Sequence, residues 1–135
     1  MIEIPKNSGF KYEIKNNRVI LDRVLDIKCP QNYGFIPDTM AEDGDPLDVF
    51  VISKEPIQTG TFVNIEVLGV FVCKDQGTQD NKLIAKIVGT TGGDMYEREE
   101  IHYYLENYKL GFEVSHYKTT FTLKELEKYK ISLKS

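Results

Sequence analysis

TFVNIEVLGVFVC, residues 61–73, is the longest strand-like stretch of the chain, and it decides the fold class. Its apolar side chains recur at every second position, which is the pattern of a β-strand. A glycine inside so long a strand predicts a bulge or a bend, as small closed barrels require. The stretch therefore predicts a bent barrel strand, and the residues expected on one of its faces are Val63, Ile65, Val67, Gly69, Phe71 and Cys73.

Shorter strands are predicted on both sides of this stretch. FKYEIK (10–15) and RVILD (18–22) form a hairpin, because Asn16-Asn17 between them tolerates the positive φ of a two-residue turn. The Pro-, Gly- and Asn-rich stretch 29–39 is predicted to be a loop. Further strands are predicted at residues 47–53, 82–88 and 111–121.

Helical patterns occur only in the last third of the chain. Asp94 with Glu97, and Thr122 with Glu125, have the spacing of capping boxes. The sequence therefore predicts a mostly β, α+β fold: a small distorted five-stranded antiparallel, OB-like β-barrel with one or two packed helices, in a single domain over residues 1–135. The apolar stripe of the longer helix is expected at Ile101, Tyr104, Leu105 and Tyr108.

The composition narrows the class of protein. The net charge is −4, whereas a nucleic-acid-binding protein usually has a basic excess. Cys29 and Cys73 have no CxxC spacing and no nearby His pair, so we expect no zinc site. The two cysteines are compatible with a single disulfide, but in a cytosolic protein we expect two reduced thiols. The start of the chain has no apolar signal core, and no apolar run approaches the ~20 residues that span a bilayer. We therefore expect a soluble cytoplasmic protein that binds neither nucleic acid nor a membrane.

Acidic residues gather in two loops at predicted strand ends. EDGDPLDVFV (42–51) contains Asp43, Asp45 and Asp48, and KDQGTQDNK (74–82) contains Asp75 and Asp80. Asp and Gly are ordinary turn residues, so either loop alone is also compatible with a solvated turn. Carboxylates held together need a compensating charge, and a hard divalent cation supplies it. Five Asp in two such loops predict a site for two or more Mg²⁺ that acts on phosphoryl oxygens.

Basic side chains lie beside the same predicted strand and helix ends. Each of them taken alone is more often a surface charge. Their common placement nevertheless suggests one site for a phosphate substrate. The candidates are Lys11, which shares a strand face with Glu13, Arg23, Lys82 and Lys109.

The motifs together resemble the soluble inorganic pyrophosphatases that use a distorted five-stranded barrel. DGDPLD (43–48) is similar to that family's signature of three Asp around a small residue and a Pro. Six further matches follow the family's order and extend the resemblance over nearly the whole chain. They are EIP at 3–5, KYE at 11–13, DR at 22–23, NYG at 32–34, DQGTQDNK at 75–82 and NYK at 107–109.

The resemblance implies hydrolysis of pyrophosphate to two phosphates with several Mg²⁺ per site, for which Mn²⁺ or Zn²⁺ could substitute. It implies that Asp45 is the general base toward the attacking water. It also implies a homo-oligomer. The implied metal-site residues are Asp43, Asp48, Asp75 and Asp80, supported by Glu3 and Glu13. The implied substrate-binding residues are Lys11, Arg23, Tyr33, Lys82, Tyr108 and Lys109.

One position departs from the family pattern. Cys29 stands one residue before Pro30, where many bacterial members of the family have Tyr. A thiol cannot reach a phosphate as a phenol does, so the resemblance implies that one substrate contact is missing here. We expect Cys29→Tyr to tighten substrate binding if the contact is merely absent.

Two other functions are compatible with the sequence. One is a phosphoanhydride hydrolase with a changed or broadened substrate range. The other is a non-enzymatic OB-like barrel that binds single-stranded nucleic acid, for which Tyr and Phe would supply stacking platforms. The acidic loops would repel a phosphate backbone unless metals were bound, and a salt-dependent gel shift without Mg²⁺ would support this alternative.

Overall fold

The computed structural model describes residues 1–24, 27–40, 44–107 and 109–129, without the side chains of residues 11–14 and 23–24. Strands dominate, and two helices follow late in the chain, as predicted. The strands are β1 (Ile2–Ile4), β2 (Phe10–Lys15), β3 (Arg18–Val24), β4 (Asn32–Ile36), β5 (Leu47–Ile52), β6 (Ile65–Asp75), β7 (Thr78–Gln79), β8 (Lys82–Ile87) and β9 (Phe112–Lys118). The helices are α1 (Met95–Asn107) and α2 (Leu123–Lys128).

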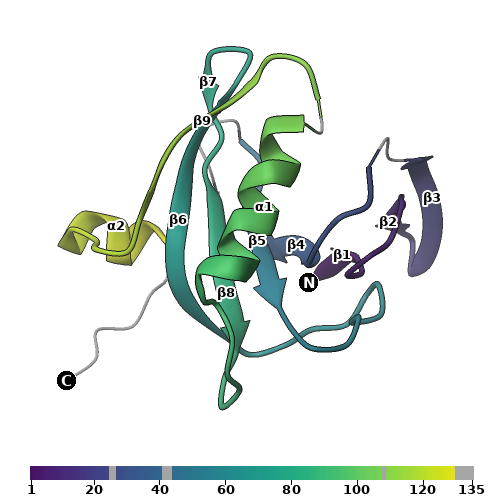
Figure 1. Cartoon of the computed structure of the whole chain (residues 1–135). Helices are drawn as coiled ribbons and strands as arrows, with labels where there is room; N and C mark the ends of the chain where they lie inside the picture. Colours follow the sequence, from purple (N-terminus) through teal and green to yellow (C-terminus); the bar gives the residue numbers. More distant parts are fainter. Residues whose placement is uncertain (25–26, 41–43, 108, 130–135) are drawn as a thin grey trace.

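Seven of the described strands form one open sheet in the order β1-β4-β5-β8-β6-β7, with β9 paired to β6. The hairpin of β2 and β3 forms a separate two-stranded sheet beside it (Figure 1). The sheet is mixed, because β5 and β8 run parallel while the other pairs are antiparallel. This parallel pair departs from the predicted antiparallel arrangement, and it is possible because the long connection between β5 and β8 contains β6 and β7.

The first hairpin confirms the sequence prediction. Asn16 and Asn17 both have positive φ, at 52° and 63°. Lys15 pairs with Arg18 across this two-residue turn, and beyond a register shift between Tyr12 and Lys11, Lys11 lies opposite Arg23. Two residues that are candidates for phosphate binding are therefore cross-strand neighbours in the backbone.

The long strand β6 begins at Ile65 and ends at Asp75, four and two residues later than the boundaries of the quoted stretch. The predicted bulge is present, because the register against β8 shifts between Val67 and Gly69. The prediction that one face continues through the bulge is wrong. Ile65 and Val67 contact one core, whereas Phe71 and Cys73 belong to the other. A one-residue shift turns every later side chain to the opposite face of the sheet.

The stretch 29–39 contains a strand, so its prediction as a loop is wrong. β4 pairs with β1 on one side and with β5 on the other. Gly34 lies at the centre of β4, where a Cβ would collide with the Met1 carbonyl oxygen. The glycine that suggested a turn is thus required for the close approach of β1.

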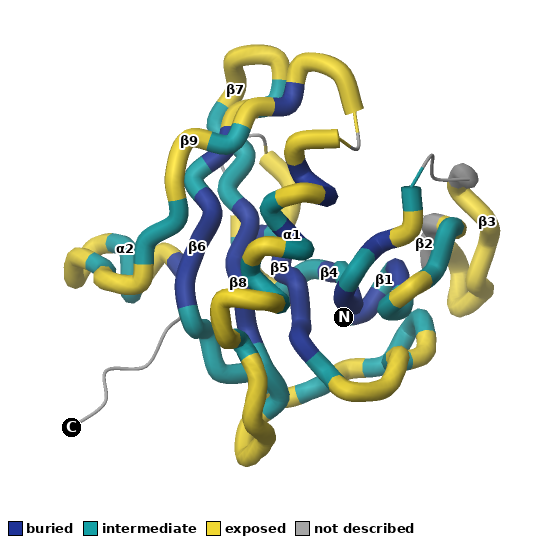
Figure 2. The backbone as a smooth tube through the Cα atoms, viewed as in Figure 1, coloured by how far each residue is buried: buried dark blue, intermediate teal, exposed yellow. Residues whose placement is uncertain are grey.

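Two apolar cores lie on the two faces of the central strands. The α1-side core contains Ile101, Tyr104 and Leu105 of α1, and the α2-side core contains Tyr129 after α2. Alternate residues of β5 and β8 face one core or the other. Most of the tube along these two strands is coloured as buried in Figure 2. Thr122 and Glu125 form the complete capping box predicted for α2. Asp94 accepts hydrogen bonds from the amides of Tyr96 and Glu97 at the start of α1, and Tyr108 lies outside the described residues.

Candidate active site

The parallel pairing of β5 and β8 brings the two acidic loops to one end of the sheet. Asp48 at the start of β5 lies opposite Lys82 at the start of β8. Asp80 precedes Lys82 by two residues, after the hairpin of β6 and β7. Parallel neighbouring strands begin at the same end of the sheet. The backbone register of β5 and β8 therefore brings these side chains together.

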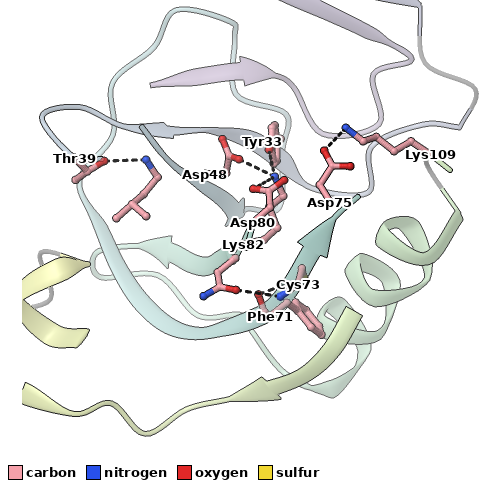
Figure 3. Close-up of polar contacts among 11 residues, drawn as sticks. Tyr33, Thr39, Asp48, Phe71, Cys73, Asp75, Asp80, Lys82 and Lys109 are labelled. Carbon is pink, nitrogen blue, oxygen red and sulfur yellow. Dashed lines mark hydrogen bonds and ion pairs between the residues drawn. The ribbon is translucent and has the colours of Figure 1, made fainter. Parts of the chain in front are cut away.

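Lys82 is the centre of the cluster (Figure 3). Its Nζ lies 2.7 Å from Asp48 Oδ2 and 3.1 Å from Asp80 Oδ1. Nζ also donates to the Tyr33 hydroxyl oxygen at 2.9 Å. The Lys82 side chain is only 3% exposed, whereas Asp48 and Asp80 are 24% and 13% exposed. We call Tyr33, Asp48, Asp80 and Lys82 the Lys82 cluster.

Aromatic rings support the ammonium group of Lys82. Nζ lies 5.4 Å from the centroid of the Tyr33 ring and 5.7 Å from that of Phe112. The Tyr33 ring in turn packs edge-on against Phe50 of the α1-side core. Attraction of a cation to these rings adds to the contacts with the two carboxylates in holding the buried ammonium group.

A second lysine–carboxylate pair lies at the end of β6. Lys109 Nζ is 2.6 Å from Asp75 Oδ2, and these side chains are 35% and 25% exposed. The other carboxylate oxygen, Asp75 Oδ1, is buried and has no hydrogen-bond partner among the described residues. A buried carboxylate oxygen without a donor can accept a cation.

The remaining predicted site residues differ in how far the structure describes them. Asp45 is exposed on the turn that leads into β5. Glu3 lies in β1, next to Ile4, which pairs with Tyr33 of β4. Lys11, Glu13 and Arg23 are placed by their backbone alone, and Asp43 and Tyr108 lie outside the described residues.

Two residues that sequence reasoning missed fix the loops of the site. Thr39 Oγ1 accepts the Leu47 amide at 2.9 Å and so anchors the start of β5. Asn81 Oδ1 accepts the Cys73 amide at 3.0 Å, and its Nδ2 donates to the Tyr129 hydroxyl at 3.1 Å. Asn81 therefore ties the turn between Asp80 and Lys82 to the body of the sheet. Asn81 lies between Asp80 and Lys82, and this position between two predicted site residues could have indicated its role.

Comparison with known proteins now identifies the family. A family model described as inorganic pyrophosphatase matches residues 1–128. The chain belongs to the inorganic pyrophosphatase family. This membership favours a hydrolase over a barrel that binds single-stranded nucleic acid.

Pyrophosphatases of known sequence match most of the chain. It is 42% identical over 111 residues to an inorganic pyrophosphatase of Nanoarchaeum equitans, which covers 81% of this chain and 69% of that protein. It is 39% identical over 124 residues to the Aquifex pyrophilus protein, covering 81% and 70%. A soluble inorganic pyrophosphatase of Solanum tuberosum is 45% identical over 89 residues, which is 63% of this chain and 42% of that protein. The chain thus spans less than half of the length of this plant relative.

Solved pyrophosphatase structures have the same fold. The Helicobacter pylori pyrophosphatase gives a TM-score of 0.82 at 28% identity, and the match covers 96% of this chain and 86% of that chain. The Thermus thermophilus pyrophosphatase gives 0.78 at 33% identity and covers 87% and 79%. The OB-like architecture expected from the sequence is thereby confirmed.

The carboxylates of the site have the chemistry that a hard divalent cation requires. Within the described part of the chain, no three acidic, His or Cys side chains are grouped closely enough to hold a metal ion. Asp43 is not among these residues. The Lys82 ammonium already lies between two of the predicted ligands. The oxygen donors, and Asp75 Oδ1 without a partner in the described part of the chain, nevertheless fit the divalent metal expected for a pyrophosphatase.

The two thiols are buried and free. Cys29 is completely enclosed in the α1-side core, and its Sγ donates to the Gln31 carbonyl oxygen at 3.0 Å. A larger side chain at this position would have to enter a packed core, so the tighter substrate binding expected of Cys29→Tyr stays a prediction. Burial raises the pKa of both Cys29 and Cys73 to about 12, so these thiols stay protonated at neutral pH.

Proposed function

We propose that this pyrophosphatase-family protein hydrolyses inorganic pyrophosphate to two phosphates in a Mg²⁺-dependent site at the start of β5 and β8. The observation that carries the proposal is the position of Lys82, a buried cation held between two carboxylates. Such a group can bind a phosphate oxygen while the carboxylates hold metal ions. The family match over residues 1–128 supports the reaction class.

We assign the metal-binding role to Asp43, Asp48, Asp75 and Asp80, with support from Glu3 and Glu13. When bound, Mg²⁺ would lower the pKa of the attacking water and neutralise charge on the phosphates. Asp45 is exposed beside this site and would accept the proton of that water. The substrate oxygens would be bound by Lys11, Arg23, Tyr33, Lys82, Tyr108 and Lys109.

Tyr33 and Lys82 would act as a unit toward one phosphate. The hydroxyl of Tyr33 accepts from Nζ in the present arrangement, so its own proton can be donated elsewhere. A phosphate oxygen beside both groups would receive one neutral and one charge-assisted hydrogen bond. The aromatic rings of Tyr33 and Phe112 would keep water away from the ammonium.

The cellular setting remains part of the proposal. We propose a cytoplasmic homo-oligomer that works as one domain over residues 1–135. The free state of both cysteines supports a reducing compartment. Among the described helices, none has the length and apolar character needed to cross a membrane.

The test is phosphate release from pyrophosphate, measured with Mg²⁺ and with EDTA, for the wild type and Asp45→Asn. We expect release only with Mg²⁺ and a loss of turnover of about 10²–10⁴-fold in the variant, which is the usual contribution of a general base. Asp38→Asn is the matched control, because Asp38 is also an exposed loop aspartate and its positive φ of 59° suits Asn. Equal turnover of wild type and Asp45→Asn would refute the assignment of the base.

The substrate class is tested in the same assay. Pyrophosphate, tripolyphosphate and ATP are offered at equal concentration with Mg²⁺, Mn²⁺ or Zn²⁺. We expect pyrophosphate with Mg²⁺ to give the highest rate. Absence of phosphate release with all three metals would rule out the enzyme, and a preference for ATP would favour the hydrolase of altered substrate range.

A further inference from the structure

The Lys82 cluster has an arrangement that its proposed function alone does not require. The ammonium contacts one oxygen of each of two carboxylates that are proposed metal ligands. We propose that the Lys82 ammonium is the counter-ion of the metal-binding carboxylates in the metal-free protein. A divalent metal ion must displace this ammonium before the substrate binds. This inference rests on the proposed function and concerns how its site is regulated.

Distances show that metal and ammonium would compete. Mg²⁺ binds carboxylate oxygens at about 2.1 Å. An ion at that distance from Asp48 Oδ2 would lie within about 5 Å of Nζ, because Nζ itself is 2.7 Å from the same oxygen. Two positive charges so close in a poorly hydrated site repel each other strongly. Metal loading of these carboxylates therefore favours a different position of the Lys82 ammonium.

The ammonium group of Lys82 can change position without a change in the backbone. A lysine ammonium sits on a flexible four-carbon stem and can form hydrogen bonds in three directions. One of its partners, Tyr33, is proposed to bind the substrate, so a phosphate oxygen beside that hydroxyl lies within reach of Nζ. Lys82 would then weaken metal binding in the substrate-free protein and strengthen substrate binding in the metal-loaded protein.

The same strand contains a suitable control. Lys86 lies four residues after Lys82 in β8, and its Nζ is 3.3 Å from Glu66 Oε2. It also donates to the Thr90 carbonyl oxygen at 2.9 Å. Lys86 and Glu66 lie at the opposite end of β8 from the proposed site. Neutralising this lysine should change local packing and overall charge without changing metal affinity.

The experiment measures metal binding without substrate. Mg²⁺ binding is followed by titration calorimetry, and Mn²⁺ binding by the loss of the free-ion paramagnetic resonance signal. We expect Lys82→Met to bind the first ion about tenfold or more tightly than wild type, because a nearby positive charge is removed. Lys86→Met should match the wild type. Lys82→Arg, which keeps the charge, should retain the weak binding of the wild type.

The substrate arm of the experiment should move in the opposite direction. With saturating Mg²⁺, methylenediphosphonate serves as a non-hydrolysable stand-in for pyrophosphate. We expect Lys82→Met to bind it about tenfold more weakly than wild type. A residue that only supports the fold would not tighten one ligand and loosen the other.

Folding is monitored by circular dichroism, because Lys82→Met removes a buried cation that contacts both Asp48 and Asp80. If Lys82→Met does not fold, Tyr33→Phe provides the second variant. It keeps the lysine but removes the oxygen that accepts from Nζ at 2.9 Å. We expect about threefold tighter binding of the first metal ion in Tyr33→Phe.

Two outcomes overturn the proposal: equal metal affinity of Lys82→Met and wild type, or weaker affinity in the variant. Failure of the proposed function looks different, because the wild type would then release no phosphate from pyrophosphate whatever its metal affinity. A protein that hydrolyses pyrophosphate and shows no gain in metal affinity in Lys82→Met refutes only the counter-ion role.

Discussion

The Lys82 cluster and the pair of Lys118 with Glu125 join the same chemical groups in different surroundings. Lys82 is 3% exposed and contacts two carboxylates at the end of the sheet. Lys118 is 30% exposed, and its ion pair with Glu125 joins the end of β9 to the first turn of α2. The first group depends on the register of two strands far apart in sequence, whereas the second depends on a local capping box.

The two ion pairs differ in how far water can solvate the lysine. Exposed ion pairs contribute about 0–1 kcal/mol, since water and salt screen them. A buried charge without a partner destabilises the fold, so removal of the carboxylates beside Lys82 should cost more stability than removal of an exposed carboxylate. The buried lysine is therefore suited to a site where charge is exchanged, and the exposed one to a modest local constraint.

The largest expected effect separates the two lysines by activity. Lys82→Met should lower kcat/KM for pyrophosphate by about 10³-fold, because a charge that stabilises phosphate oxygens in the transition state is lost. Lys118→Met should leave kcat/KM within about twofold of the wild type, since Lys118 lies outside the proposed site. Phosphate release at saturating Mg²⁺ measures both. Similar losses in the two variants would remove the functional side of the comparison.

The next effect separates the two groups by stability. Asp48→Asn/Asp80→Asn removes the two described carboxylates from the buried Lys82 ammonium and should lower the free energy of unfolding by about 3 kcal/mol. Glu125→Gln should lower it by about 0.5 kcal/mol. Urea denaturation in EDTA measures the two values. A double variant more stable than the wild type would mean that the two carboxylates repel each other more than they attract Lys82.

The smallest effect concerns acid pH. The hydrogen bond from Lys118, together with the amide of Thr122, lowers the pKa of Glu125. A carboxyl group with a lowered folded-state pKa contributes stability above its unfolded value of 4.5, and this contribution is lost as pH falls through the folded value. Glu125→Gln should therefore be less stable than wild type at pH 6 by at most about 0.5 kcal/mol. The difference should shrink toward pH 3, and thermal unfolding at both values checks it; a constant difference would exclude titration of Glu125 as its cause.

The sequence predicted the elements whose signals are local. Asn16-Asn17 marked its hairpin, and the spacing of Thr122 and Glu125 marked the start of α2. The strand around Gly34 was missed, because that glycine serves a close approach to β1 that only the folded chain contains. The two faces of β6 were assigned wrongly for a related reason. Gly69 suggested a bulge, but nothing in the sequence says on which side of it the register shifts.

The sequence predicted which residues form the candidate site, but it did not predict how they are arranged in space. Motif spacing singled out Asp48, Asp80 and Lys82 as residues of one site. That Lys82 is buried between the two carboxylates follows from the parallel register of β5 and β8, which was not expected. Short-range signals such as a D-x-K triplet do not encode a strand pairing across more than thirty residues. For Asp43 and Tyr108, which lie outside the described residues, the assigned roles stay predictions.

The place of β6 between the two cores has a consequence for how the protein unfolds. Side chains of β6 alternate between the two faces of the sheet on both sides of the bulge. Ile65, Val67, Val70 and Val72 therefore pack into the α2-side core, and Leu68, Phe71 and Cys73 into the α1-side core. Neither core can melt while β6 keeps its place, and detaching β6 exposes apolar side chains of both. Loss of order should thus be all-or-none across the sheet. A pyrophosphatase built in this way has no half of its core that can loosen while the other half preserves the site.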